Sequence, residues 1–84
     1  MQKYTIAVLV NNQSGVLNRV SGMFRRRGFN INSLTVSETE SEQFSRITVT
    51  YEATPEMNHQ IVTQLYKLPD VIKVKEAARA TWLG

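Results

Sequence analysis

Residues 11–37 read NNQSGVLNRVSGMFRRRGFNINSLTVS, and this one stretch holds a turn, a helix, a stop signal and a strand. Ser14 stands where a helix N-cap is expected, and Gly28 stands where a left-handed residue would end the helix. The arginines at 25–27 fall in the last turn, where cations suit the negative end of the helix dipole. Between these signals, apolar side chains recur at helical spacing: Val16, Leu17, Val20, Met23 and Phe24.

Two strands are expected to flank this helix. Residues 3–10 (KYTIAVLV) are mostly apolar and rich in β-branched side chains, which is typical of a central strand buried on both faces. Residues 29–37 (FNINSLTVS) predict a second strand, but the apolar alternation slips phase between Ile31 and Leu34. A β-bulge near residues 32–33 would produce such a slip.

The second half of the chain again alternates strand and helix signals. The polar residues 38–43 suit a hairpin loop, and residues 44–53 alternate in polarity as a half-buried strand does. A Thr-Pro pair at 54–55 supplies an N-cap and a first helical residue, and a Pro-Asp pair at 69–70 ends this helix. A fourth strand begins at residues 71–74.

The predicted order of elements is therefore β-α-β-β-α-β. Right-handed crossovers in this order give an α+β, ferredoxin-like fold, in which a four-stranded antiparallel sheet carries both helices on one face. An 84-residue chain has room for one domain with a thin core, so pairing with a second copy or a partner would add stability. We expect the domain in residues 1–78 and a C-terminal tail without periodicity in residues 79–84.

The composition limits the class of protein. Cysteine is absent, which excludes a disulfide framework and a thiolate metal site. No segment has the apolar length of a signal peptide or a membrane helix, so we expect a cytoplasmic protein that makes no membrane contact. Ten Lys and Arg against seven Asp and Glu give a formal charge of +3, which permits an acidic partner without requiring one.

The titratable residues form no catalytic constellation. His59, the only histidine, lies off the apolar stripe of the second helix and is expected at the surface. Glu38, Glu40 and Glu42 share a hairpin loop with no histidine or aspartate pair nearby, so neither catalysis nor metal binding is favoured. No serine lies in a G-x-S-x-G elbow. We therefore expect no enzyme and no metal site.

Two other protein classes with this topology fit the residues poorly. Acylphosphatases hold a phosphoryl group with an arginine in the loop before the first helix, and residues 11–16 contain no arginine. RNA-recognition domains stack bases on aromatic residues within a Lys/Arg-Gly-aromatic motif. Tyr4, Phe44 and Tyr51 are present, but that motif is not, so nucleic acid is not an expected partner.

The turn into the first helix is the best candidate for a binding site. A helix N-terminus presents unpaired N–H groups and a partial positive charge, which suit a carboxylate. Gly15 would let a ligand approach the backbone, Asn12 offers a donor and an acceptor, and Asn30 could accept from an ammonium group. The apolar residues around a ligand side chain would be Val16, Leu17 and Ile31. The same residues also suffice for a tight turn and a helix cap, and the sequence leaves both interpretations open.

Residues 12–20 (NQSGVLNRV) resemble the opening of ACT domains, in which an N-x-[S/P]-G-[VA]-L pattern starts the first helix. Further segments resemble, in order and at family spacing, the small regulatory subunit of acetohydroxyacid synthase, also called acetolactate synthase. These segments are residues 22–24, 27–31, 33–36, 45–48, 64–68 and 70–71. The resemblance covers about residues 3–76.

The resemblance implies a non-catalytic regulatory subunit that binds a catalytic large subunit and confers feedback inhibition. Thiamine diphosphate, magnesium and FAD would belong to the catalytic partner, and this chain would hold no cofactor. The implied effector is valine, or a related branched-chain amino acid such as isoleucine, bound between two copies of a homodimer. By position, one wall of the site would be Asn12, Ser14, Gly15, Val16 and Leu17, and the other, from the neighbouring copy, would be Asn30 and Ile31.

Two questions stay open at this stage. Many such subunits continue into a second domain, and this sequence stops at Gly84, so activation of the catalytic subunit is not implied with the same force as sensing. Trp82 could contact a partner or fold back on the sheet. The alternative function is a free-standing ACT-like module that binds another small effector or acts as a scaffold.

Overall fold

The computed structural model describes residues 1–77 and the backbone of residues 81–83. The elements follow the predicted β-α-β-β-α-β order, with one short strand added at the end. They are β1 (Gln2–Asn11), α1 (Val16–Arg26), β2 (Ile31–Glu38), β3 (Phe44–Ala53), α2 (Pro55–Tyr66), β4 (Val71–Glu76) and β5 (Thr81–Leu83).

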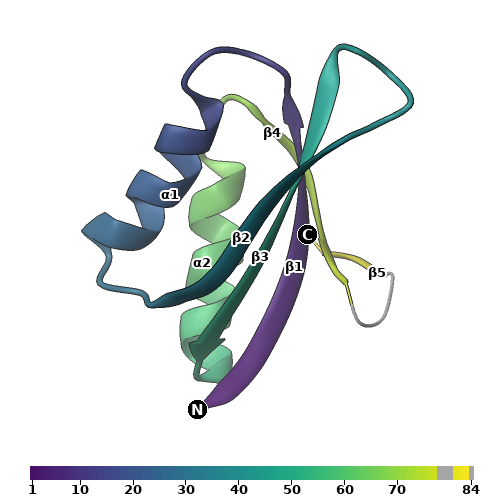
Figure 1. Cartoon of the computed structure of the whole chain (residues 1–84). Coiled ribbons are helices and arrows are strands. Elements are labelled where there is room, and N and C mark those ends of the chain that lie inside the picture. The colour runs from purple at the N-terminus through teal and green to yellow at the C-terminus, as the bar shows by residue number, and fades with distance from the viewer. Residues whose placement is uncertain (78–80, 84) are drawn as a thin grey trace.

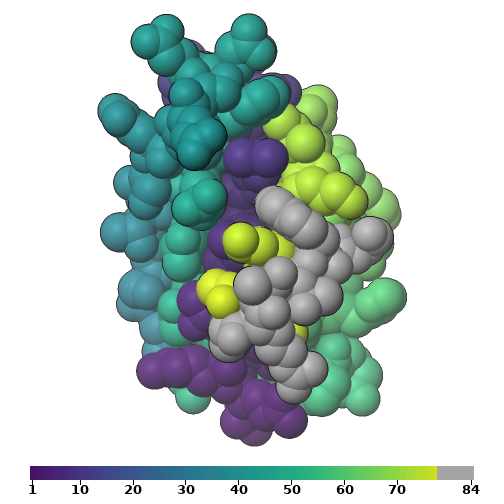
Figure 2. Space-filling model, turned by 90° about the vertical axis from the view of Figure 1, so that its right-hand side faces the viewer, coloured from purple at the N-terminus to yellow at the C-terminus, as the bar shows by residue number. Residues whose placement is uncertain are grey.

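The strands form one antiparallel sheet in the order β2-β3-β1-β4-β5, and both helices cover the same face of it (Figure 1). The four-stranded ferredoxin-like arrangement is confirmed. The pairing of β5 with β4 was not predicted, because residues 77–84 carry no alternation. Figure 2 shows the helix-free face of the sheet, with the hairpin between β2 and β3 at its upper edge. The predicted boundary at residues 78–79 and the side chain of Trp82 lie outside the described residues.

The core lies between the sheet and the two helices. The central strand β1 and its neighbour β3 each direct alternate apolar side chains toward the helices. Helices α1 and α2 each pack one apolar face against these side chains. The largest side chains below 2% exposure are Ile6, Val8, Val10, Val20, Phe24, Ile47, Val49, Tyr51, Ile61, Leu65 and Val74. Because β1 runs through the middle of this core, the turn that leaves its end is anchored on one side.

The ends of the helices confirm two sequence signals and correct a third. The Thr54 hydroxyl accepts a 3.1 Å hydrogen bond from the Met57 N–H and caps α2, as predicted. Gly28 adopts φ +72° just after α1, as predicted for a stop. The prediction that Ser14 caps α1 is wrong, since the N-cap is Gly15 and no side chain caps this helix. Gly15 stands at φ +84°, so the chain enters the helix one residue later than a serine cap would require.

Two strand and helix boundaries also differ from the sequence pattern. The predicted bulge is confirmed as a register shift between Ile31 and Ser33. The strand begins at Ile31 and not at residue 29, because the preceding residues complete the turn after Gly28. Helix α2 ends at Tyr66, so Leu68 contacts the core from the following turn and not from the helix.

Tyr51 on β3 is a buried polar group in this core. Its hydroxyl hydrogen-bonds to Asn58 Oδ1 on α2, and its ring packs against Phe24 with the centroids 5.5 Å apart. Burial, with smaller contributions from Tyr4 and Glu76, raises the pKa of the Tyr51 phenol well above its ordinary value of 10.0. The folded state therefore requires the neutral phenol.

This requirement predicts a loss of stability at alkaline pH. The unfolded chain releases the Tyr51 proton near pH 10 while the folded chain retains it, so stability present below pH 10 is lost as pH rises. This one group contributes a slope that approaches about 1.4 kcal/mol per pH unit. We expect the melting temperature of Tyr51→Phe to fall less steeply between pH 9 and 11 than that of the wild type or of Tyr4→Phe. Equal slopes in all three proteins would contradict the assignment.

Candidate ligand-binding site

The turn between β1 and α1 leaves the start of α1 open. Backbone hydrogen bonds from Asn12 N–H to Gln43 O (2.8 Å) and from Val16 N–H to Gln13 O (3.3 Å) hold its shape. The first turn of α1 has neither a side-chain cap nor an acidic residue. Among the described residues, no side chain therefore caps the remaining N–H groups of this turn or offsets the positive end of the helix dipole, which favours an anion at this position.

Asn12 is tied to the neighbouring hairpin. Its Nδ2 donates to the Glu42 carbonyl (3.1 Å), and its Oδ1 accepts from the Ser45 hydroxyl (3.2 Å). An asparagine side chain has a second N–H and a second lone pair, so one donor and one acceptor position remain for a ligand. Within the chain, however, Asn12 orients the hairpin against the turn, a role that the sequence did not indicate.

A small cavity of about 120 Å³ lies beside this turn. It brings together the predicted residues Asn12, Val16 and Leu17 with Val36 of β2 and Ile47 of β3. Leu17 and Val36 are 41% and 51% exposed, so apolar side chains remain uncovered at its mouth. Sequence reasoning missed Val36 and Ile47 as site residues, although their pairing across β2 and β3 could have been found from the alternation of both strands.

Asn30 and Ile31 are not part of this cavity. Ile31 pairs with Tyr51 at one end of β3, while Asn12 bonds to Gln43 beyond the other end. Eight residues of extended strand separate the two positions by about 25 Å. One chain therefore cannot bring the two predicted walls together, and only a second copy could supply Asn30 and Ile31 to this cavity.

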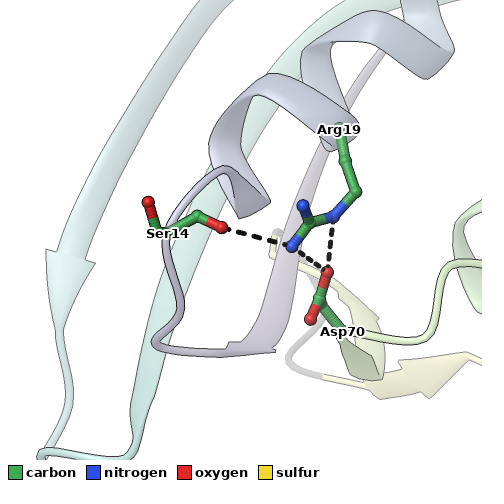
Figure 3. Close-up of polar contacts among 3 residues, drawn as sticks. All are labelled: Ser14, Arg19 and Asp70. Atoms are coloured by element: carbon green, nitrogen blue, oxygen red, sulfur yellow. Dashed lines mark hydrogen bonds and ion pairs between the residues drawn. The ribbon is translucent and has the colours of Figure 1, made fainter.

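Arg19 is a residue at this turn that sequence reasoning did not single out. Its Nε donates to Asp70 Oδ2 at 2.7 Å, its Nη2 lies 2.5 Å from the same oxygen, and Nη2 also reaches the Ser14 carbonyl at 3.5 Å (Figure 3). A Cβ on Gly15 would stand 3.0 Å from Arg19 Nη1, so the guanidinium lies directly over this glycine. No sequence signal joins residues that are 51 positions apart.

A larger depression of about 610 Å³ lies on the helix-free face below the hairpin. Leu9, Phe44 and Arg46 line it together with Glu38 and Glu40. Two carboxylates beside one guanidinium make it a poorer place for an anionic ligand than the start of α1. Among residues 1–77, no three His, Asp or Glu side chains lie close enough together to hold a metal ion, and His59 is exposed as predicted.

Neither α1 nor α2 has the length and continuous apolar character needed to cross a membrane, and no other helix occurs in the described part of the chain.

The family model that residues 6–73 match defines the class: this is an ACT domain, and its element order is the β-α-β-β-α-β order seen in the structure. The ACT domain from the GTP pyrophosphokinase of Chlorobium tepidum shares the fold with a TM-score of 0.74 at 13% identity, over 92% of this chain and 86% of that one. Within the class, residues 6–73 match the AHAS small subunit-like ACT domain, and the chain belongs to that family.

Relatives in this family carry consistent names. The chain is 52% identical over 79 residues to the probable acetolactate synthase small subunit of Archaeoglobus fulgidus. It is 48% identical over 75 residues to the acetolactate synthase small subunit of Mycobacterium avium. The crystal structure of the acetolactate synthase small subunit from Thermotoga maritima superposes with a TM-score of 0.84 at 38% identity.

This chain corresponds to only part of those proteins. The alignments cover 94%, 89% and 90% of this chain, but 50%, 45% and 47% of the Archaeoglobus, Mycobacterium and Thermotoga chains. The chain therefore spans about half the length of the relatives it matches.

Proposed function

We propose that this chain is a non-catalytic regulatory subunit of acetolactate synthase that binds valine, or a related branched-chain amino acid, between two copies. One observation carries the proposal: a largely apolar cavity opens beside an uncapped helix N-terminus, and one chain supplies only one of the two predicted walls. Membership of the acetolactate synthase small-subunit family supports the identity of the enzyme that it regulates.

Each part of an amino acid has a matching place in this arrangement. The free N–H groups at the start of α1 would receive the carboxylate. A branched side chain would fill the cavity between Val16, Leu17 and Val36, where it gains from the burial of apolar surface. The ammonium group would need an acceptor, and the carbonyl oxygen of Asn30 from a second copy would supply one.

The edge strand β2 offers a way to bring two copies together. The outer side of β2 has no strand partner among the described residues, since β2 ends the sheet order. Antiparallel pairing of two β2 strands about Leu34 would place Ile31 of one copy opposite Ser37 of the other. That position is one residue from Val36 at the mouth of the cavity. A homodimer of this kind would complete the site twice.

The catalytic large subunit is the partner that this proposal requires. Thiamine diphosphate, magnesium and FAD would reside there, and the cytoplasm is the expected place of assembly. Valine would favour one arrangement of the two ACT domains, and the catalytic subunit would respond to that arrangement. The inhibition can be no larger than the difference in valine affinity between the two arrangements.

A thermal-shift panel of the twenty amino acids tests the effector. Ligand at one hundred times its dissociation constant stabilises the folded state by about 2.7 kcal/mol. For a domain of this size we expect valine, leucine or isoleucine to raise the melting temperature by about 10 °C or more. Alanine is the matched control, because it has the same charged groups and too small a side chain. Co-purification with a large thiamine-dependent subunit tests the partner.

The panel also separates the alternative function. That alternative is a free-standing ACT-like module that binds another small effector or acts as a scaffold. No response to any amino acid would favour that alternative and contradict the proposal of a valine sensor.

A further inference from the structure

We propose that Arg19 and Asp70 form a positioning pair that holds the effector-binding turn in shape, so that affinity for the effector depends on a contact outside the cavity. This inference rests on the proposed function. Neither residue lines the cavity of about 120 Å³. Both act through the Ser14–Gly15 turn, against which the effector carboxylate would lie.

The guanidinium joins two segments that are far apart in the sequence. Its Nε and Nη2 both bind one oxygen of Asp70, while Nη2 reaches back to the Ser14 carbonyl at 3.5 Å (Figure 3). Arg19 also closes the first backbone bond of α1, from its N–H to the Gly15 carbonyl at 3.0 Å. The side chain of Arg19 therefore contacts the Ser14 carbonyl, and its main-chain N–H contacts the Gly15 carbonyl.

Asp70, the partner of the Arg19 guanidinium, is itself held in place by burial and by a backbone hydrogen bond. It is 8% exposed, and its carbonyl accepts the Asn11 N–H at 2.9 Å, which ties the turn before β4 to the end of β1. The buried carboxylate and the strand end are thus one rigid unit. Arg19, which is 44% exposed, extends from α1 to this unit across the turn. Such a fork needs a planar guanidinium, because an ammonium group cannot make both contacts with the same geometry.

The arrangement differs from a simple surface ion pair. An exposed pair contributes little to stability, and its removal would leave ligand binding unchanged. A positioning pair instead sets where the N–H groups of α1 and the Ser14 backbone lie relative to the ligand. An error of about 1 Å in such a site is enough to cause a large loss of affinity.

The test measures valine binding by calorimetry, well below the melting temperature, for the wild type, Arg19→Gln, Arg19→Lys and Asp70→Asn. We expect each substitution to weaken binding about tenfold or more. Arg19→Lys keeps the charge and is the variant least able to disturb folding. The double variant Arg19→Gln/Asp70→Asn should lose little more valine affinity than the single variant that binds valine less tightly, because both changes break the same contact. Arg26→Gln removes the same charge from the same helix, away from the turn, and should bind as the wild type does.

The binding data distinguish failure of the proposed function from failure of the positioning role. If the wild type binds no branched-chain amino acid, the proposed function falls and this inference falls with it. If the wild type binds valine, and Arg19→Lys and Asp70→Asn bind it equally well, the proposed function stands and the positioning role is wrong. Binding retained by Arg19→Lys but lost by Arg19→Gln would also overturn it, because charge alone would then explain the effect.

Discussion

Replacing Gly15 by aspartate should abolish the response of this chain to valine. Gly15 is the last residue before α1, and the proposed carboxylate position lies against its backbone. A fixed carboxylate there would occupy the N–H groups that the ligand needs, and it would repel the ligand carboxylate. It would also meet Arg19 Nη1 at the position where a Cβ comes within 3.0 Å, and so compete with Asp70 for the guanidinium. We expect the valine affinity to fall by at least a hundredfold.

Backbone strain has to be separated from this effect. Gly15 has φ +84°, where a residue with a Cβ costs on the order of 1 kcal/mol. Gly28→Asp is the matched control, because Gly28 has φ +72° and a Cβ there would meet no atom within 4 Å. We expect Gly28→Asp to lose a similar amount of thermal stability and to keep its valine affinity. Gly15→Ala adds the strain and the close contact without the charge, and should lie between the two.

The outcome that would contradict the proposed site is normal valine binding by a folded Gly15→Asp variant. Calorimetry gives the affinity, and a melting curve of the same sample shows that the variant is folded. Loss of binding in Gly28→Asp as well would show that backbone strain alone abolishes binding, and the loss in Gly15→Asp would then no longer support a site at the turn.

Local patterns predicted most of the fold because each has a local physical cause. The alternation in β3 places Ile47, Val49 and Tyr51 on the helix side, and all three are buried. The cap at Thr54 depends only on neighbouring residues, and it was predicted correctly. The cap predicted at Ser14 was wrong, because Gly15 adopts a positive φ and the helix begins one residue later.

What the sequence could not predict depends on contacts between distant segments. The Arg19–Asp70 pair exists because the end of β1 and the turn before β4 meet in the fold, which no spacing in the chain reveals. The strand β5 forms because it pairs with the edge of β4, and its own sequence has no alternation of polar and apolar residues that would predict a strand. The resemblance assigned Asn30 to the neighbouring copy, and one chain holds Asn30 about 25 Å from Asn12, so a site that joins the two residues requires that second copy.

The second large effect is expected at the edge strand, where Val36→Asp should prevent the two copies from pairing. Val36 lies on β2 at the mouth of the cavity and is 51% exposed, so a single chain should tolerate the change. In a pair joined along β2, the new carboxylate would be buried without a partner, which costs several kcal/mol. We expect the dimer dissociation constant to rise at least a hundredfold in sedimentation experiments, and the valine response to disappear with it.

Ile72→Asp is the matched control for this change. Ile72 is an apolar β-branched residue that is 37% exposed. It lies on β4, which is separated from β2 by the strands β3 and β1. It should leave pairing and valine binding as they are in the wild type. A Val36→Asp protein that dimerises normally would place the interface elsewhere. Because binding free energies are reciprocal, valine must strengthen dimerisation of the wild type by the factor by which dimerisation strengthens valine binding. If valine leaves that dimer constant unchanged, the ligand does not lie between the two copies.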